Sequence, residues 1–116
     1  MQIIINTDRH MHGGESLAAT VRAIVEGALE RFNGQITRVD VHLGDENGNK
    51  SGGDDKRCMI EAKLEGHGPV AVTQYSETVA QAIDGAAQRL VHRIDHTLGR
   101  QQGHRRQGAP VPIEPD

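Results

Sequence analysis

A row of basic side chains near the end of the chain is the feature of the sequence best suited to binding chemistry. Arg89, Arg93, His96 and Arg100 follow one another at spacings of four, three and four residues. In an α-helix these spacings place the four side chains within a stripe about 60° wide. Guanidinium groups in such a row can contact successive phosphates, and protonated histidines add positive charge. The row predicts an anionic partner, although a solvated helix face with cations near its C-terminus explains the same pattern.

RNA is the anionic partner that the rest of the composition favours. Duplex RNA is read largely through its shape, its phosphates and its 2′-hydroxyls, so this mode of binding needs no row of aromatic rings. The chain has one Phe, one Tyr and no Trp. Further basic side chains supply secondary contacts in this hypothesis. The complete set of predicted RNA-binding residues is Arg89, His92, Arg93, His96, Arg100, Arg22, Arg31 and Arg38.

Metal binding is an alternative interpretation of part of the same segment. His92 and His96 are spaced like two ligands on one helix face, and Asp95 lies beside them, but no third ligand is fixed by the spacing. The loop that begins at Asp45 has oxygen-bearing residues at alternate positions, as calcium loops do. However, Lys56 stands where a bidentate glutamate should close such a site. We therefore expect neither a metal nor any other cofactor.

Catalysis has little support in the sequence. None of Ser16, Ser51 and Ser76 lies in a nucleophile-elbow motif, and Cys58 falls at an inward-facing position of a predicted strand. Acidic and basic residues are plentiful, but they form no constellation whose geometry the sequence fixes. We predict that the protein is not an enzyme and has no small-molecule substrate.

Length and composition limit the protein to one small domain. The chain has 116 residues, a formal net charge of −3 and one cysteine. A single cysteine allows no intrachain disulfide, which favours a reducing, cytoplasmic location. No apolar run approaches the roughly 20 residues that a membrane span needs, and no signal-peptide pattern opens the sequence.

The hydropathy pattern predicts six elements. Alternating or β-branched runs indicate strands over residues 2–6, 36–43, 57–65 and 70–75. Apolar residues at helical spacing indicate helices from Ser16, a predicted N-cap, to a left-handed Gly34, and from Glu77 to Leu98. Residues 44–56 should form a hairpin loop, and residues 100–116 a disordered tail after a domain spanning 1–99.

These elements predict an α/β two-layer fold (α+β) with the order β-α-β-β-β-α. One helical crossover joins the first two strands, so these strands should be parallel, and the next three should form a meander. A single apolar sheet face remains to be covered. We expect both helices to pack on that one face of the four-stranded sheet.

Several segments resemble the ribosome hibernation-promoting factor family, also called ribosome-associated inhibitor or sigma-54 modulation protein. They are Met-Gln-Ile-Ile-Ile at the start, Leu-Glu-Arg-Phe at 29–32, and Ala-Ile-Asp-Gly at 82–85 leading into a basic helix. The resemblance covers about residues 1–100 and includes the order of the elements. It implies a non-enzymatic protein that binds the small ribosomal subunit and its RNA in the path of messenger and transfer RNA, and so silences idle ribosomes.

The resemblance also assigns roles to particular positions. Arg89, His92, His96 and Arg100 match positions where the family usually carries Lys or Arg, so two of the four are His here. On the first helix, where the family carries several Lys, this chain has Val-Glu-Gly-Ala at 25–28. The alternative function is therefore a protein-interaction or regulatory module on the same fold that has lost ribosome affinity.

Overall fold

The computed structural model describes residues 1–8, 14–45 and 55–107, with side chains as far as Gly99 in the last helix. Its element order confirms the predicted β-α-β-β-β-α fold. The elements are β1 (Gln2–Thr7), α1 (Gly14–Leu29), a 3₁₀ turn η1 (Glu30–Phe32), β2 (Ile36–Asp45), β3 (Lys56–Leu64), β4 (Pro69–Ser76) and α2 (Val79–Gln107).

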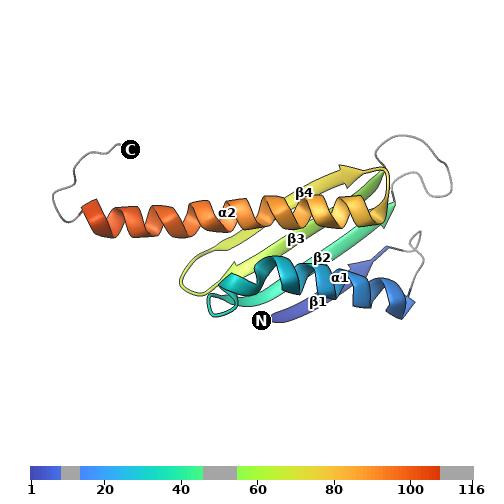
Figure 1. Cartoon of the computed structure of the whole chain (residues 1–116), viewed down its shortest axis with the longest axis horizontal. Helices are drawn as coiled ribbons and strands as arrows, with labels where there is room; N and C mark the ends of the chain where they lie inside the picture. The colour runs from blue at the N-terminus through green and yellow to red at the C-terminus, as the bar shows by residue number, and fades with distance from the viewer. Residues whose placement is uncertain (9–13, 46–54, 108–116) are drawn as a thin grey trace.

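The four strands form one sheet in the order β1-β2-β3-β4. β1 pairs with β2 in parallel, whereas β2–β3 and β3–β4 are antiparallel, so the predicted meander is confirmed. Figure 1 shows both helices on the same face of this sheet, with α1 nearer β1 and α2 crossing β3 and β4. The opposite face carries no helix among the described elements.

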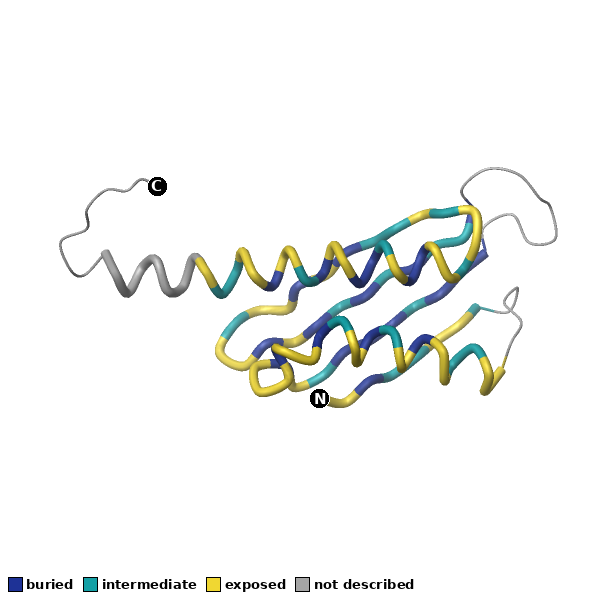
Figure 2. The backbone as a smooth tube through the Cα atoms, in the orientation of Figure 1, coloured by how far each residue is buried: buried dark blue, intermediate teal, exposed yellow. Residues whose placement is uncertain are grey.

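The core lies between the sheet and the two helices (Figure 2). Because side chains alternate along a strand, every second residue of β2 and β3 points towards the helices. Val39, Val41, Ile60 and Ala62 do so and are fully buried. From α2 the core receives Leu90 and others at helical spacing, and burial of such a side chain stabilises the fold by about 1.5–3 kcal/mol.

The ends of α1 differ from the prediction. α1 begins at Gly14, whose φ of 52° lies in the left-handed region that favours glycine, so Ser16 is inside the helix and is not its cap. At the other end the α-helix stops at Leu29 and tightens into η1. This tighter turn packs Phe32 into the core, and Gly34 does not adopt the predicted left-handed conformation.

α2 starts close to its predicted position but extends further. The Oγ1 of Thr78 accepts a hydrogen bond from the backbone N–H of Gln81 at 3.1 Å, so Thr78 is the N-cap. The helix continues to Gln107 instead of ending at Leu98, and it projects beyond the sheet (Figure 1). Residues 100–107 are rich in Gln and Arg, which favour helix. The predicted boundary at 99/100 therefore falls inside α2, and the rest of the predicted tail, 108–116, lies outside the described residues.

Cys58 is packed in the core, as predicted, and this burial has a measurable consequence. The residue is fully buried on β3, and burial raises the pKa of its thiol to about 12. Because the thiolate is the reactive species, we expect iodoacetamide at about pH 8 to leave the native protein unmodified and to alkylate it fully in denaturant. Mass spectrometry of both reactions tests this. Rapid alkylation of the native protein would contradict the packing described for Cys58.

Candidate nucleic-acid interface

Charged side chains are sorted to opposite sides of α2. The side away from α1 carries Arg89, His92, Arg93 and His96, all of them exposed, and we call these four residues the cationic flank. No Asp or Glu in the described part of α2 falls on this side at helical spacing. The predicted row of basic residues thus occupies one continuous, accessible surface. Arg100 lies in α2, but its side chain is outside the described residues.

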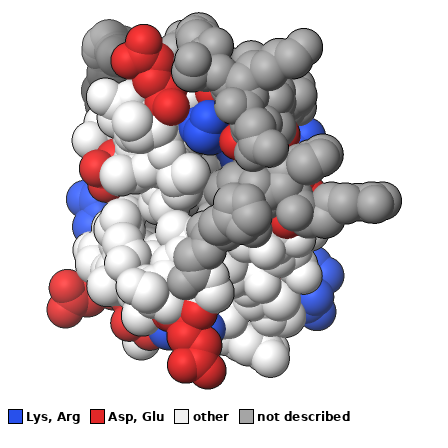
Figure 3. Space-filling view, turned by 90° about the vertical axis from the view of Figure 1, so that its right-hand side faces the viewer, with Lys and Arg blue, Asp and Glu red and all other residues white. Residues whose placement is uncertain are grey.

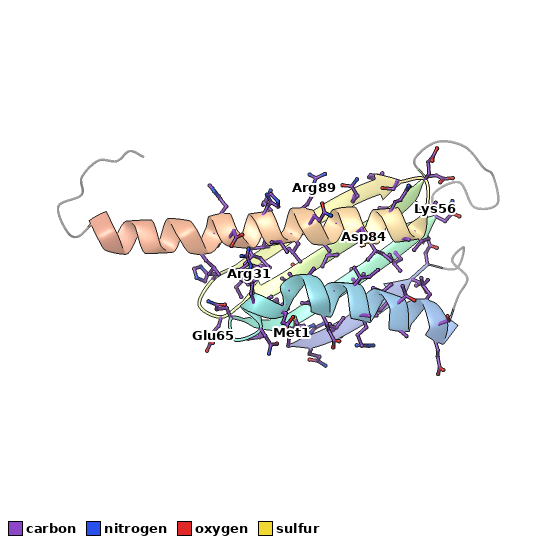
Figure 4. The ribbon with its side chains drawn as sticks, viewed as in Figure 1. Met1, Arg31, Lys56, Glu65, Asp84 and Arg89 are labelled. Atoms are coloured by element: carbon purple, nitrogen blue, oxygen red, sulfur yellow. The ribbon has the colours of Figure 1, made fainter. Side chains whose placement is uncertain are left out.

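The acidic side of α2 is occupied by contacts within the protein. The carboxylate of Asp95 forms an ion pair with Arg31, which follows α1 in the turn η1. The guanidinium of Arg31 also lies 4.6 Å from the centre of the Phe32 ring. In Figure 4, Arg31 lies between the two helices and Arg89 lies on the far side of α2. The ion pair links the two helices, while the cationic flank remains exposed.

A groove of about 540 Å³ lies between the cationic flank and β4. One wall comes from the inward-facing residues Val72 and Gln74 of β4, and the other from α2 through Gly85, Gln88, Arg89, His92 and Arg93. Nη1 of Arg89 donates a hydrogen bond to Oε1 of Gln74 at 3.4 Å. This contact places the guanidinium of Arg89 at the edge of an open, positively charged groove.

Gly85 makes room for Gln74 in this groove. A Cβ at position 85 would lie 2.8 Å from Cγ and 2.9 Å from Cδ of Gln74. Contacts this short force the glutamine side chain to move. A glycine within a helix therefore has a packing reason here, despite its cost of about 1 kcal/mol relative to alanine.

Two glycine-to-alanine substitutions test this packing. Gly27 of α1 is the matched control, because a Cβ there meets nothing within 4 Å. We expect Gly27→Ala to raise the free energy of unfolding by about 0.5–1 kcal/mol, the ordinary gain in a helix interior. Gly85→Ala should gain less or lose stability, since it displaces Gln74. Urea unfolding measures both, and an equal gain in the two variants would contradict the close contact.

The three predicted secondary contacts do not join the cationic flank. Arg22 lies on α1 and its Nη1 donates to the backbone carbonyl of Ile3 at 3.0 Å. Arg31 is in the ion pair on the other side of α2. Arg38 points from β2 to the sheet face without helices, where its Nε and Nη2 donate to one carboxylate oxygen of Asp40 at 3.2 and 3.1 Å. Each of these arginines has a partner within the protein.

The sheet face without helices carries both acidic and basic side chains, and one of its acidic groups is buried. Asp40 is buried, with an exposed fraction of 7%, beneath its ion pair with Arg38. Glu61 stands opposite Asp40 on β3, and Lys63 stands opposite Arg38. Acidic and basic side chains therefore alternate between neighbouring rows, and this face lacks the single sign of charge found on the cationic flank.

At the end of the sheet where β2 stops and β3 begins, Lys56 forms an ion cluster with two aspartates. Nζ of Lys56 lies 3.0 Å from Oδ1 of Asp55 and 3.4 Å from Oδ2 of Asp45. The hydrogen bond to Asp55 and the two negative charges raise the pKa of Lys56, although partial burial opposes them. The rest of the calcium-like loop, 46–54, lies outside the described residues. Figure 3 views this end of the molecule and shows acidic and basic groups interspersed.

Neither a metal centre nor a membrane-spanning helix is found in the part of the chain that the structure describes. No three His, Cys, Asp or Glu side chains there are close enough to hold a metal ion. His92 and His96 lie on the cationic flank, whereas Asp95 points to α1. None of the helices described is long and apolar enough to cross a bilayer.

The sequence alone did not predict that β4 forms one wall of the groove. Gln74 follows Val70 and Val72 at the same parity, so the alternation placed a polar residue on the inward face of the sheet. A polar residue at an inward position usually has a polar partner there. That signal pointed to a contact for Gln74, but only the tertiary structure identifies Arg89 as the partner.

One family model matches this chain, and solved structures share its fold. A family model described as Sigma 54 modulation protein / S30EA ribosomal protein matches residues 4–102. The crystal structure of the Thermus thermophilus Protein Y N-terminal domain superposes with a TM-score of 0.63 and 23% identity, covering 84% of this chain and 99% of that one.

A second solved structure, a ribosomal subunit interface protein from Coxiella burnetii, superposes with a TM-score of 0.59 at 15% identity. The alignment covers 89% of this chain and 99% of that one. At these identities the two structures establish the shared fold. A sequence comparison with curated proteins gives no match. The family model covers most of the chain, and the chain therefore belongs to the Sigma 54 modulation protein / S30EA ribosomal protein family.

Proposed function

We propose that this protein is a ribosome-associated translation inhibitor of the cytoplasm that binds the RNA of the small ribosomal subunit. The cationic flank of α2 is the contact surface, extended by Arg100, and occupation of the decoding region silences the idle ribosome. The observation that carries this proposal is the exposed row of two arginines and two histidines with no acidic residue on the same side of the helix. Family membership supports a ribosomal partner.

Phosphate binding explains why this row stands on an otherwise acidic protein. The chain has a net charge of −3, so no general positive field attracts RNA, and local charge must provide the attraction. Each Arg that neutralises a phosphate releases counterions, which makes the affinity fall as salt rises. The groove beside Arg89 and Arg93 can admit a sugar-phosphate backbone alongside the helix. Binding should therefore be salt-dependent and only weakly dependent on base sequence.

One observation favours the alternative function, a protein-interaction module without ribosome affinity. The exposed side of α1 carries Glu15 and Glu26, and Arg22 is the one basic residue in this helix. A shallow surface at the end of α1 is lined by Glu26 and Glu30 without any Lys or Arg. RNA would be repelled from this side, so any ribosome contact must rely on α2.

Sedimentation with ribosomes tests the proposal. Purified protein is centrifuged with whole ribosomes, with isolated small subunits and with isolated large subunits, at low and at physiological salt. We expect co-sedimentation with whole ribosomes and with small subunits at both salts, and none with large subunits. Protein that stays in the supernatant at both salts would refute ribosome binding and leave the interaction module as the function.

A further inference from the structure

We propose that the free edge of β4 and the cationic flank of α2 together accept an extended acidic segment of a partner protein, which adds to the sheet as a fifth strand. This inference goes beyond RNA binding and does not depend on it. It concerns the groove already described, whose two walls offer two kinds of recognition. β4 offers backbone hydrogen bonds, and α2 offers positive charge.

β4 is an edge strand, and none of the other described strands pairs with its outer side. It is the outermost strand beside β3, and its sequence from Pro69 to Ser76 contains no Lys, Arg, Asp or Glu. No register shift interrupts its pairing with β3, so no bulge twists the edge away. Edge strands in natural proteins are usually protected by charges, bulges or covering segments. Within the part of the chain that the structure describes, the proline at the first residue of β4 is the one device of this kind, and the rest of the edge is able to pair.

β1 forms the opposite edge of the sheet, and an arginine of α1 contacts its backbone. On β1 the side chain of Arg22 reaches from α1 and donates to the backbone carbonyl of Ile3 at 3.0 Å. That contact occupies a main-chain acceptor of the edge strand. On the β4 side, Arg89 donates to the side chain of Gln74, and Nε2 of Gln74 donates to the backbone carbonyl of its neighbour Tyr75 at 3.4 Å. Each edge therefore has one backbone carbonyl that accepts from a side chain, and β4 is the better place for an acidic strand because Arg89 and Arg93 lie beside it.

The spacing of Arg89 and Arg93 favours an acidic segment as the added strand. Side chains on one face of an added strand recur every second residue, about 6.8 Å apart. Arg89 and Arg93 are one helical turn apart, which corresponds to about 6 Å along the axis. Two carboxylates at alternate positions of the added strand can therefore each meet one guanidinium. Val72 and Gln74 of β4 also line the groove. Side chains of the added strand that point towards α2 therefore enter a partly apolar space.

An occupant of this groove would exclude RNA from the cationic flank. Both ligands need the guanidinium groups of Arg89 and Arg93, and neither can bind while the other holds them. An acidic strand from a partner would thus release the protein from the ribosome, or keep it from binding. This consequence is separate from the strand addition itself, which is measurable without ribosomes.

Short synthetic peptides provide the test. The probe is an acetylated and amidated peptide of alternating threonine and glutamate, which has no aromatic residue. One control replaces each glutamate by glutamine, and a second control carries N-methyl groups on the backbone nitrogens of one edge. Tyr75 is the single tyrosine of the chain, lies on β4 and is 45% exposed, so its fluorescence reports binding at this edge. Amide hydrogen exchange locates the protected strand.

We expect saturable binding of the glutamate peptide and slower exchange of the β4 amides. The glutamine peptide should bind about two- to tenfold more weakly, as expected for the loss of exposed ion pairs. An N-methylated peptide with the methyl groups facing β4 should not bind. Equal binding of that peptide would overturn strand addition, because charge alone would then explain the affinity. Absence of saturable binding would overturn it as well, including the case in which an RNA oligonucleotide binds and the peptide does not.

Two protein variants test whether the α2 wall of the groove contributes to peptide binding. Arg93→Gln removes one charge from the cationic flank without changing β4, and Lys63→Gln removes one charge from the sheet face without helices. We expect the first variant to weaken the glutamate peptide severalfold and the second to leave it unchanged. Equal effects would place the peptide elsewhere. Circular dichroism of both variants verifies that the fold is retained.

Discussion

Reversing the charge of both Arg89 and Arg93 should reduce the affinity for small ribosomal subunits by about a hundredfold or more. Each charge-assisted hydrogen bond to a phosphate contributes about 1.5–3 kcal/mol, and every 1.4 kcal/mol changes a binding constant tenfold. Arg89→Glu with Arg93→Glu also adds repulsion between the new carboxylates and the phosphates. Co-sedimentation over a series of protein concentrations measures the change. The slope of log affinity against log salt should decrease by about 0.7–0.9 for each phosphate that the protein no longer neutralises.

Lys63→Glu is the matched control for the single variant Arg93→Glu. Both residues are exposed, both substitutions change the net charge equally, and Lys63 lies on the sheet face without helices. The control should bind as the unmodified protein does, within about twofold. Equal reductions of affinity in the two single variants would mean that total charge governs binding and that the cationic flank has no special role.

Leu90→Ala should lower the free energy of unfolding by about 2–5 kcal/mol. The side chain of Leu90 is fully buried and belongs to the core between α2 and the sheet. Its removal leaves a cavity that close packing fills only in part. Because native domains are stable by only about 5–15 kcal/mol, this decrease is a large share of the total. Urea unfolding followed by circular dichroism measures it.

Gln88→Ala serves as the control on the same helix, since Gln88 is exposed and the substitution keeps a good helix former. Its effect on the free energy of unfolding should stay within about 0.5 kcal/mol. A decrease below about 1 kcal/mol for Leu90→Ala would contradict the docking of α2 on the sheet. That docking fixes the direction of the cationic flank, so the two variants also test whether α2 is held in the orientation described.

The strands and their order could be predicted because their signals are local. Alternation along β2 and β3 placed Val39, Val41, Ile60 and Ala62 on one face, and the structure buries all four. The helical crossover implied the parallel pair, and the short turn from β3 to β4 implied an antiparallel pair. Two helices with one apolar side each had a single sheet face to cover.

Helix details were predicted less well, because they depend on tertiary contacts. Helical spacing along α1 predicts an inward line through Leu17, Val21 and Ile24, with Val25 and Leu29 at its edge. The structure buries Val21, Val25 and Leu29, whereas Leu17 and Ile24 are only half-buried. The end of α2 was misplaced because Gly99 resembles a stop signal, although a helix can continue through an isolated glycine.

The candidate site was predicted only in part, because it too depends on contacts between different elements. Helical spacing alone placed Arg89, Arg93 and His96 together, and the structure leaves all three exposed on one flank. Spacing within one helix carries no information about other elements, so it could not show that Arg31 pairs with Asp95 on the opposite side. The groove itself requires β4 beside α2, which sequence patterns do not place.

Site-specific crosslinking tests whether the cationic flank of α2 contacts the RNA of the small subunit. A photoreactive amino acid replaces Gln88, which is exposed beside Arg89 and lines the groove, and in a second variant it replaces Lys63 on the other face of the sheet. Both proteins are irradiated on whole ribosomes. We expect crosslinks from position 88 to small-subunit RNA and none to that RNA from position 63. Crosslinks to small-subunit RNA from position 63 alone, or from neither position while the protein remains bound, would contradict binding through the cationic flank.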